Sequence, residues 1–246
     1  MLGKLLKYDF RSIGRILFPV YGAMLVAAIL LGLSSRNTNV SLTIAIIYSV
    51  LLIAAMVMTV VLVIQRFYQN LLGSQGYLMF TIPVSTGTHI FAKVLTALIW
   101  GLIGVLVVVL SGVLIVVFDP SLGGFQGIGE MMNAMFQVHL NPEDQKTLLF
   151  SIVLGILTVT ALVTRIYASI SVGHLWSGHR LLGAFLAYIG FQILVFWLIS
   201  EIGLSLVPDS ILNEQAMLAE LLVPLLQIVL YGAITWLILD RRLNLE

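Results

Sequence analysis

The chain has 246 residues, of which 60% are apolar and 9% are charged, whereas soluble domains carry about 25% charged residues. No soluble fold of this size can bury so much apolar surface, so we expect lipid to cover part of it. The net charge of +1 gives no indication of nucleic-acid binding, and the absence of cysteine excludes disulfides, thiolate metal sites and a cysteine nucleophile.

The first 17 residues predict a helix that lies in the membrane interface. They carry an apolar stripe and a basic stripe at helical spacing, which would place one face in lipid and the other among headgroups. The alternative is a basic cluster beside the membrane that only sets topology. The apolar stripe comprises Leu2, Leu6, Phe10, Ile13 and Leu17, and the basic stripe comprises Lys4, Lys7, Arg11 and Arg15.

Six stretches are long and apolar enough to cross a bilayer as helices, which takes about 20 residues each. We therefore expect an all-α integral membrane protein whose residues 1–246 form a single transmembrane domain. Barrel strands would alternate over about ten residues, whereas these runs are continuous and longer. The predicted spans are Ile16–Leu33, Val40–Ile64, Ile90–Phe118, Thr147–Ser171, Leu181–Leu206 and Leu221–Leu239.

The positions of lysine and arginine predict the orientation of these spans. With six spans both termini share a side, and that side holds ten of the twelve basic residues. The positive-inside rule therefore predicts that both termini are cytoplasmic. Arg36 and Lys146 fall outside, and the inner set is Lys4, Lys7, Arg11, Arg15, Arg66, Lys93, Arg165, Arg180, Arg241 and Arg242.

Residues 65–89, between the second and third spans, form a predicted cytoplasmic loop that is unusually apolar. Gly73 is placed to end one helical turn, Pro83 to end the next, and Ser85 to cap the third span. An exposed apolar cluster usually marks a protein contact; the alternative is a loop that folds back under the bundle or dips into the interface. The cluster consists of Phe67, Tyr68, Leu71, Leu72, Tyr77, Leu78, Met79 and Phe80.

Residues 119–146 form the longest external connection. A glycine-rich stretch is followed by a short amphipathic pattern, which we expect to rest as a helix on the outer leaflet. The alternative is a methionine-rich, adaptable surface for an amphipathic substrate. The pattern consists of Ile128, Met131, Met132, Met135, Phe136 and Leu140.

A few ionisable residues fall within or beside the predicted spans. Lys93 and Arg165 are expected near the cytoplasmic ends, where their side chains can reach the interface. Glu201 is expected near the outer boundary, where it either faces water or lines an exit cavity or gate. His174 and His179 are five residues apart, on different helix faces, so we expect interfacial histidines and not a metal site.

Motifs for catalysis and nucleotide binding are absent from the sequence. It contains no His-Glu-x-x-His zinc motif, no Gly-x-Ser-x-Gly elbow and no phosphate-binding loop. We therefore expect no catalytic residue, metal or cofactor in this chain. A membrane-embedded enzyme would need convergent polar groups in a pocket. A self-sufficient secondary transporter or channel would need ionisable groups near mid-membrane, and the predicted spans offer almost none.

The segment between the second and third spans also resembles a known family. It is similar to the first cytoplasmic loop of ABC-2-type ABC transporter permeases of Gram-positive bacteria, and the chain's opening and its six-span plan are similar as well. The connection between the third and fourth spans is longer than the family's short turn. The matching residues are Arg66-Phe67-Tyr68, Asn70-Leu71, Gly76 to Thr81 and Pro83-Val84-Ser85, with Leu5 to Arg11 at the opening.

The resemblance implies a permease subunit of a multi-pass exporter in the bacterial cell membrane, carrying antimicrobial peptides or other amphipathic compounds. A second permease chain, identical or different, would pair with it, and a separate cytoplasmic ABC ATPase would bind ATP and Mg²⁺. Membrane lipid is the other expected partner, and no nucleic acid is expected. The loop 65–89 would be the coupling helix, with Arg66, Phe67, Tyr68, Asn70, Leu71, Tyr77, Leu78 and Phe80 contacting the ATPase.

Overall fold

The structure is a computed structural model that describes most of the chain, and its described residues form helices and their connections without any strand. They divide into two compact units. The N-terminal unit comprises Lys7–Val63 and Ile99–Asn141, and the C-terminal unit comprises Met1–Leu6, Ile64–Leu98 and Pro142–Glu246. The described residues are 2–35, 37–72, 85–122, 124–127, 129, 133, 142–176, 178–206 and 214–241.

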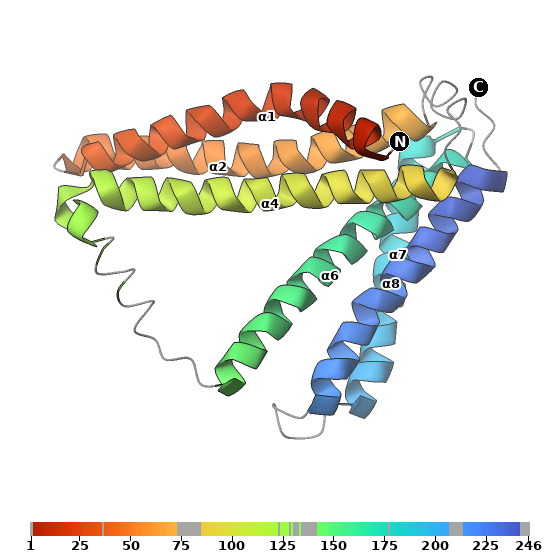
Figure 1. The fold of residues 1–246 in the computed structure, drawn as a ribbon. Helices are drawn as coiled ribbons and strands as arrows, with labels where there is room; N and C mark the ends of the chain where they lie inside the picture. The colour runs from red at the N-terminus through yellow and green to blue at the C-terminus, as the bar shows by residue number, and fades with distance from the viewer. Residues whose placement is uncertain are drawn as a thin grey trace. The chain divides into compact units, whose positions relative to one another are not determined.

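Among the described residues, six helices are long and apolar enough to cross a membrane, as the six predicted spans require, and the all-helical class is confirmed (Figure 1). Most extend beyond the predicted apolar runs, because polar residues at the ends continue the helical hydrogen bonds. They are α1 (Leu2–Leu33), α2 (Thr38–Phe67), α4 (Thr86–Phe118), α6 (Pro142–His174), α7 (Arg180–Leu206) and α8 (Glu214–Arg241), with a π-helical turn η1 (Tyr68–Leu72) and a 3₁₀ turn η2 (Pro120–Leu122).

The lead segment and the first span form one uninterrupted helix, α1. Protein covers part of its apolar stripe, because Ile13 and Leu17 are buried and Phe10 stacks on Trp100 with ring centroids 4.7 Å apart. Pro19 lies inside the helix and leaves one carbonyl of the preceding turn without a helical hydrogen bond. A position of residues 2–17 at the membrane surface remains a prediction.

Within the N-terminal unit, α1, α2 and α4 run alongside one another (Figure 1). Two hydroxyl pairs join them across apolar faces. Tyr21 lies 2.9 Å from Thr59, and Tyr48 lies 2.7 Å from Ser111, measured between oxygens. Side-chain hydroxyls inside a bilayer need such partners, because lipid supplies none. The buried core consists of Ile13, Leu17, Tyr21, Met24, Ala55, Leu62 and Trp100.

Within the C-terminal unit, α6 packs against both α7 and α8 (Figure 1). The backbones of α6 and α7 come so close that a Cβ added at Gly173 would lie 2.6 Å from the Cα of Ala184. Small residues permit this approach between membrane helices. On α8, Tyr231 packs on the ring of Phe191 and donates a hydrogen bond of 3.3 Å to its carbonyl.

The connection between α4 and α6, which the sequence predicts to be external, is described only in part. α4 ends at Phe118, as Asp119 and Pro120 predict, and η2 follows. α6 already begins at Pro142, so the connection is shorter than the predicted 119–146. The residues of the predicted amphipathic helix, Ile128, Met131, Met132, Met135, Phe136 and Leu140, lie outside the described residues.

Candidate functional site

The predicted partner-contact segment begins within a helix and not in an open loop. α2 continues past the predicted end at Ile64 and passes directly into η1, which packs against α6. A π-helical turn widens the helix by one residue, and such turns are frequent at functional sites. The rest of the segment, residues 73–84 with Tyr77, Leu78 and Phe80, lies outside the described residues.

Phe67 anchors the described part of this segment. Its side chain is fully buried and stacks on Tyr167 of α6, with ring centroids 3.9 Å apart and planes inclined by 6°. Tyr167 is buried as well, and its hydroxyl donates to the backbone carbonyl of Lys93 in α4 at 3.4 Å. The end of α2 is therefore held against both α6 and α4 within the C-terminal unit.

The residues predicted to contact an ATPase divide by exposure. Phe67, Asn70 and Leu71 are buried inside the C-terminal unit, which is the position that the fold-back alternative predicts for them. Their contact with an ATPase stays a prediction. Arg66 is half-buried, and Tyr68 is 38% exposed and meets the ring of His174 edge-on. Among the described members of the set, only Arg66 and Tyr68 offer side chains to another protein.

Arg165 is buried and lies within α6, away from the helix end. It lies about 14 Å from the C-terminal end of α6, at 1.5 Å per residue, and is only 8% exposed. Its Nη1 donates to Oε1 of Gln192 at 2.5 Å, and its guanidinium carbon lies 5.6 Å from the ring centre of Tyr188. Lys93 is buried too, at 4% exposure. Both side chains are therefore packed inside the C-terminal unit, and the expectation that they reach the membrane interface stays a prediction.

A cavity of about 400 Å³ opens beside Arg165 between α6, α7 and α8. Gln192 and Glu220 are exposed at this cavity, whereas Arg165 is buried, so the cavity opens onto the surface of the unit. Pro224 has no N–H, so the carbonyl of Glu220 lacks its helical hydrogen bond. The remaining lining residues are Leu154, Thr158, Ala161, Leu162, Val195, Val223 and Gln227.

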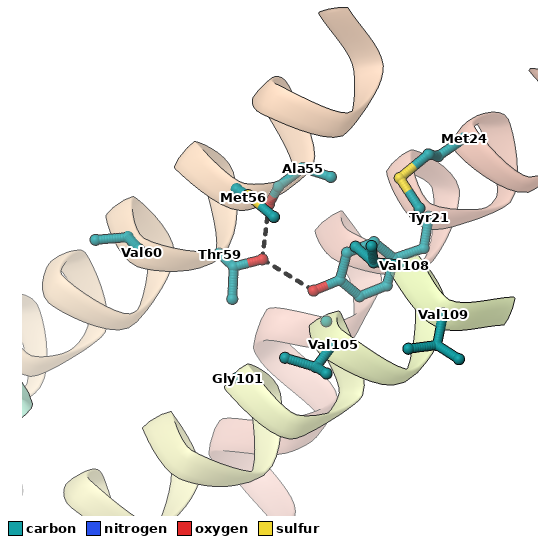
Figure 2. A pocket seen from close by; sticks show the side chains of 11 residues that line it. Tyr21, Met24, Ala55, Met56, Thr59, Val60, Gly101, Val105, Val108 and Val109 are labelled. Carbon is teal, nitrogen blue, oxygen red and sulfur yellow. Dashed lines mark hydrogen bonds between the residues drawn. The ribbon is translucent and has the colours of Figure 1, made fainter. Parts of the chain in front are cut away.

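A second cavity, of about 380 Å³, lies in the N-terminal unit and is almost wholly apolar. Figure 2 shows its polar feature, the hydroxyls of Tyr21 and Thr59. Thr59 donates to the carbonyl of Ala55 at 2.7 Å, so Tyr21 donates to Thr59. Gly101 adds no side chain to the wall, and the other lining residues are Met24, Met56, Val60, Gly104, Val105, Val108 and Val109. Such walls suit an acyl chain and not a charged group.

The other predicted residues occupy separate places. Glu201 lies near the C-terminal end of α7, and its side chain is outside the described ones, as is that of Lys4. Lys7, Arg11 and Arg15 are exposed on α1. No group of three or more metal-binding side chains occurs within the described ranges.

Sequence reasoning missed the environment of Arg165, because its partner Gln192 is 27 residues away on another helix. The one signal available was the rule that an ionisable residue inside a span marks a functional site. No protein-family model, curated protein or solved structure matches the chain. Six apolar helices occur in transporters, channels and enzymes alike, so only particular residues separate these functions.

Proposed function

We propose that the chain is the membrane-spanning permease subunit of an ATP-driven ABC exporter of amphipathic compounds, such as antimicrobial peptides, in a bacterial cell membrane. Two permease chains would pair, and a separate cytoplasmic ATPase would bind ATP and Mg²⁺. The six apolar helices support a membrane role. The resemblance of Arg66–Ser85 and Leu5–Arg11 to ABC-2-type permeases supports the particular function.

The observation that carries the proposal is the stack of Phe67 on Tyr167. A segment that transmits movement from an ATPase must be attached firmly to the membrane helices. The ring pair stabilises that attachment by about 1 kcal/mol beyond simple burial, and the hydroxyl of Tyr167 extends it to α4. A force applied at the half-buried Arg66 and the exposed Tyr68 would then move the ends of α2, α4 and α6 together.

The charge distribution supports a cytoplasmic position for this segment. Lysine and arginine gather on the side of the chain that also holds residues 65–89, which the positive-inside rule assigns to the cytoplasm. A soluble ATPase would meet the protein on that side. The chain itself carries no phosphate-binding loop, so the energy source would lie in the partner.

A self-sufficient secondary transporter or channel is the second candidate, and one observation favours it. Arg165 is buried among α6, α7 and α8 beside an open cavity. Ionisable groups in such positions line substrate and ion pathways. The two candidate functions differ in their energy source: an ABC permease needs an ATPase partner, whereas a secondary transporter or channel would work without one.

Vesicle flotation tests the proposed function. The full-length chain is reconstituted into liposomes, a candidate ABC ATPase from a neighbouring reading frame is added, and the ATPase that floats with the vesicles is measured. The proposal predicts flotation of the ATPase, weakened by about thirtyfold in affinity when Arg66→Gln and Tyr68→Ala are combined. Tyr8→Ala, which removes another exposed tyrosine, should leave flotation unchanged.

Neither substitution touches a buried side chain, so the variant and the wild-type chain should insert in equal amounts. The amount of inserted chain is measured alongside flotation to check this. An ATPase that stays in solution with wild-type vesicles would contradict the proposal. Substrate uptake into ATPase-free vesicles under an ion gradient would support the second candidate instead.

A further inference from the structure

Arg165 is a buried cation that has no counter-ion among the residues that the structure describes. Within the described part of the chain it forms no ion pair, and its strongest contact is with the neutral amide of Gln192. Burying a charged side chain inside a membrane-spanning bundle costs free energy, and such a residue is retained where it has a partner or a function. The ring of Tyr188 offsets part of this free-energy cost through a cation–π contact.

The guanidinium group keeps hydrogen-bonding capacity that the protein does not use. It has five N–H donors in a fixed fork. Nη1 donates to Gln192, whereas Nε is buried and has no hydrogen-bond partner among the described residues. Carboxylates and phosphates match this fork with two parallel hydrogen bonds. The unused donor therefore favours an anionic group as the missing partner.

The cavity beside Arg165 has the size and walls that such a ligand needs. Its volume of about 400 Å³ falls within the range of about 300–1,000 Å³ that is usual for small-molecule sites. Leu154, Leu162 and Val195 line it with apolar surface. Because α6, α7 and α8 are all long and apolar enough to cross a membrane, the apolar body of such a ligand would suit the surroundings of this cavity.

Glu220 is the one described carboxylate that lines the same cavity. It is exposed and forms no ion pair with Arg165. It therefore leaves the guanidinium free for an external anion, and its own charge would repel that anion weakly across the cavity. This arrangement gives a direct prediction for Glu220→Gln.

We propose that Arg165 is the anion-binding residue of a site between α6, α7 and α8 that takes the carboxylate or phosphate of an amphipathic molecule. The anion would be held by the guanidinium group where Arg165 lines the cavity, and the apolar part would lie along the cavity wall. Gln192, which lines the same cavity, would orient the guanidinium group through its hydrogen bond. The site is independent of the proposed ATPase, so it can be tested on the purified chain alone.

The test uses the full-length protein in phosphatidylcholine nanodiscs. Dodecyl phosphate is the probe, dodecanol is the neutral control of equal chain length, and binding is measured by native mass spectrometry. The wild-type protein should bind dodecyl phosphate about tenfold or more tightly than dodecanol. Arg165→Gln should abolish this preference, whereas Arg15→Gln, which removes an exposed arginine, should preserve it.

Two further variants keep the test decisive if Arg165→Gln fails to fold. Gln192→Glu supplies an internal carboxylate, so it should retain the fold and abolish the preference for phosphate. Glu220→Gln should preserve or increase the preference. Equal binding of both probes by the wild-type protein would overturn the proposal. It would also be overturned if Gln192→Glu bound the phosphate as the wild type does, because Arg165 would then only join α6 to α7.

A competition arm identifies the source of the ligand. Phosphatidylglycerol is added to the nanodiscs at increasing fraction, with the dodecyl phosphate concentration held constant. Displacement of the probe would assign the site to a phospholipid headgroup. Retention of the probe would assign it to an amphipathic molecule other than bulk lipid.

Discussion

Phe67→Ala should destabilise the C-terminal unit without changing any exposed surface. Phe67 is fully buried and its ring lies parallel to that of Tyr167, with centroids 3.9 Å apart. Phe→Ala in soluble cores costs about 3–5 kcal/mol. Lipid is as apolar as a protein core, so part of the transfer free energy is not lost in a membrane, and we expect about 2–3 kcal/mol here.

Unfolding in mixed micelles of sodium dodecyl sulfate and a mild detergent measures this loss. Tyr68→Ala is the matched control, because Tyr68 follows directly but is 38% exposed; it should change the unfolding free energy by less than about 0.5 kcal/mol. A double-mutant cycle with Tyr167→Ala should give a coupling free energy of about 1 kcal/mol. Unchanged unfolding of Phe67→Ala, or a coupling of zero, would refute the role of the stack.

Three other predictions concern packing, orientation and the lead helix. Gly173→Ala should destabilise the protein by about 1–3 kcal/mol in the same unfolding assay, because the new methyl group would meet the backbone of Ala184. Gly155 has open space around it, so Gly155→Ala should be neutral or stabilising. A reporter fused after Glu246 should read as cytoplasmic and a tag at Gly124 as external, and a cytoplasmic tag at Gly124 would exclude the predicted topology. Neutralising the basic stripe should weaken its attraction for anionic lipid by about 1 kcal/mol per charge. The variant combines Lys4→Gln, Lys7→Gln, Arg11→Gln and Arg15→Gln, and the measurement is the enrichment of anionic lipid around the protein in mixed nanodiscs at several salt concentrations. Unchanged enrichment would leave the stripe without a lipid role.

The spans could be predicted from the sequence because each is a continuous apolar run, and length alone identifies such a run as a membrane helix. The ends were harder to predict. α2 passes its predicted boundary at Ile64 because Phe67 and Leu71 are buried against the rest of the unit. A segment rich in aromatic residues has the same composition whether it faces a partner or packs against its own helices. Only contacts between distant parts of the chain distinguish these two arrangements.

The candidate sites could not be predicted for a related reason. A helix that is apolar on every side carries no periodic signal that identifies its inner face. The position of Arg165 in the sequence therefore allowed a side chain directed to the interface, whereas the structure directs it toward Gln192 on α7. The stack of Phe67 on Tyr167 joins residues 100 positions apart, and no spacing rule covers such a separation.

ATP hydrolysis in reconstituted vesicles tests the central claim most directly. A candidate ABC ATPase from a neighbouring reading frame is assayed alone, with vesicles that contain the wild-type chain, and with vesicles that contain the combined Arg66→Gln and Tyr68→Ala variant. The proposed permease function predicts that the wild-type chain changes the hydrolysis rate, that an amphipathic substrate stimulates it further, and that the variant removes both effects at equal insertion. An ATPase rate that is the same with and without the wild-type chain would contradict it.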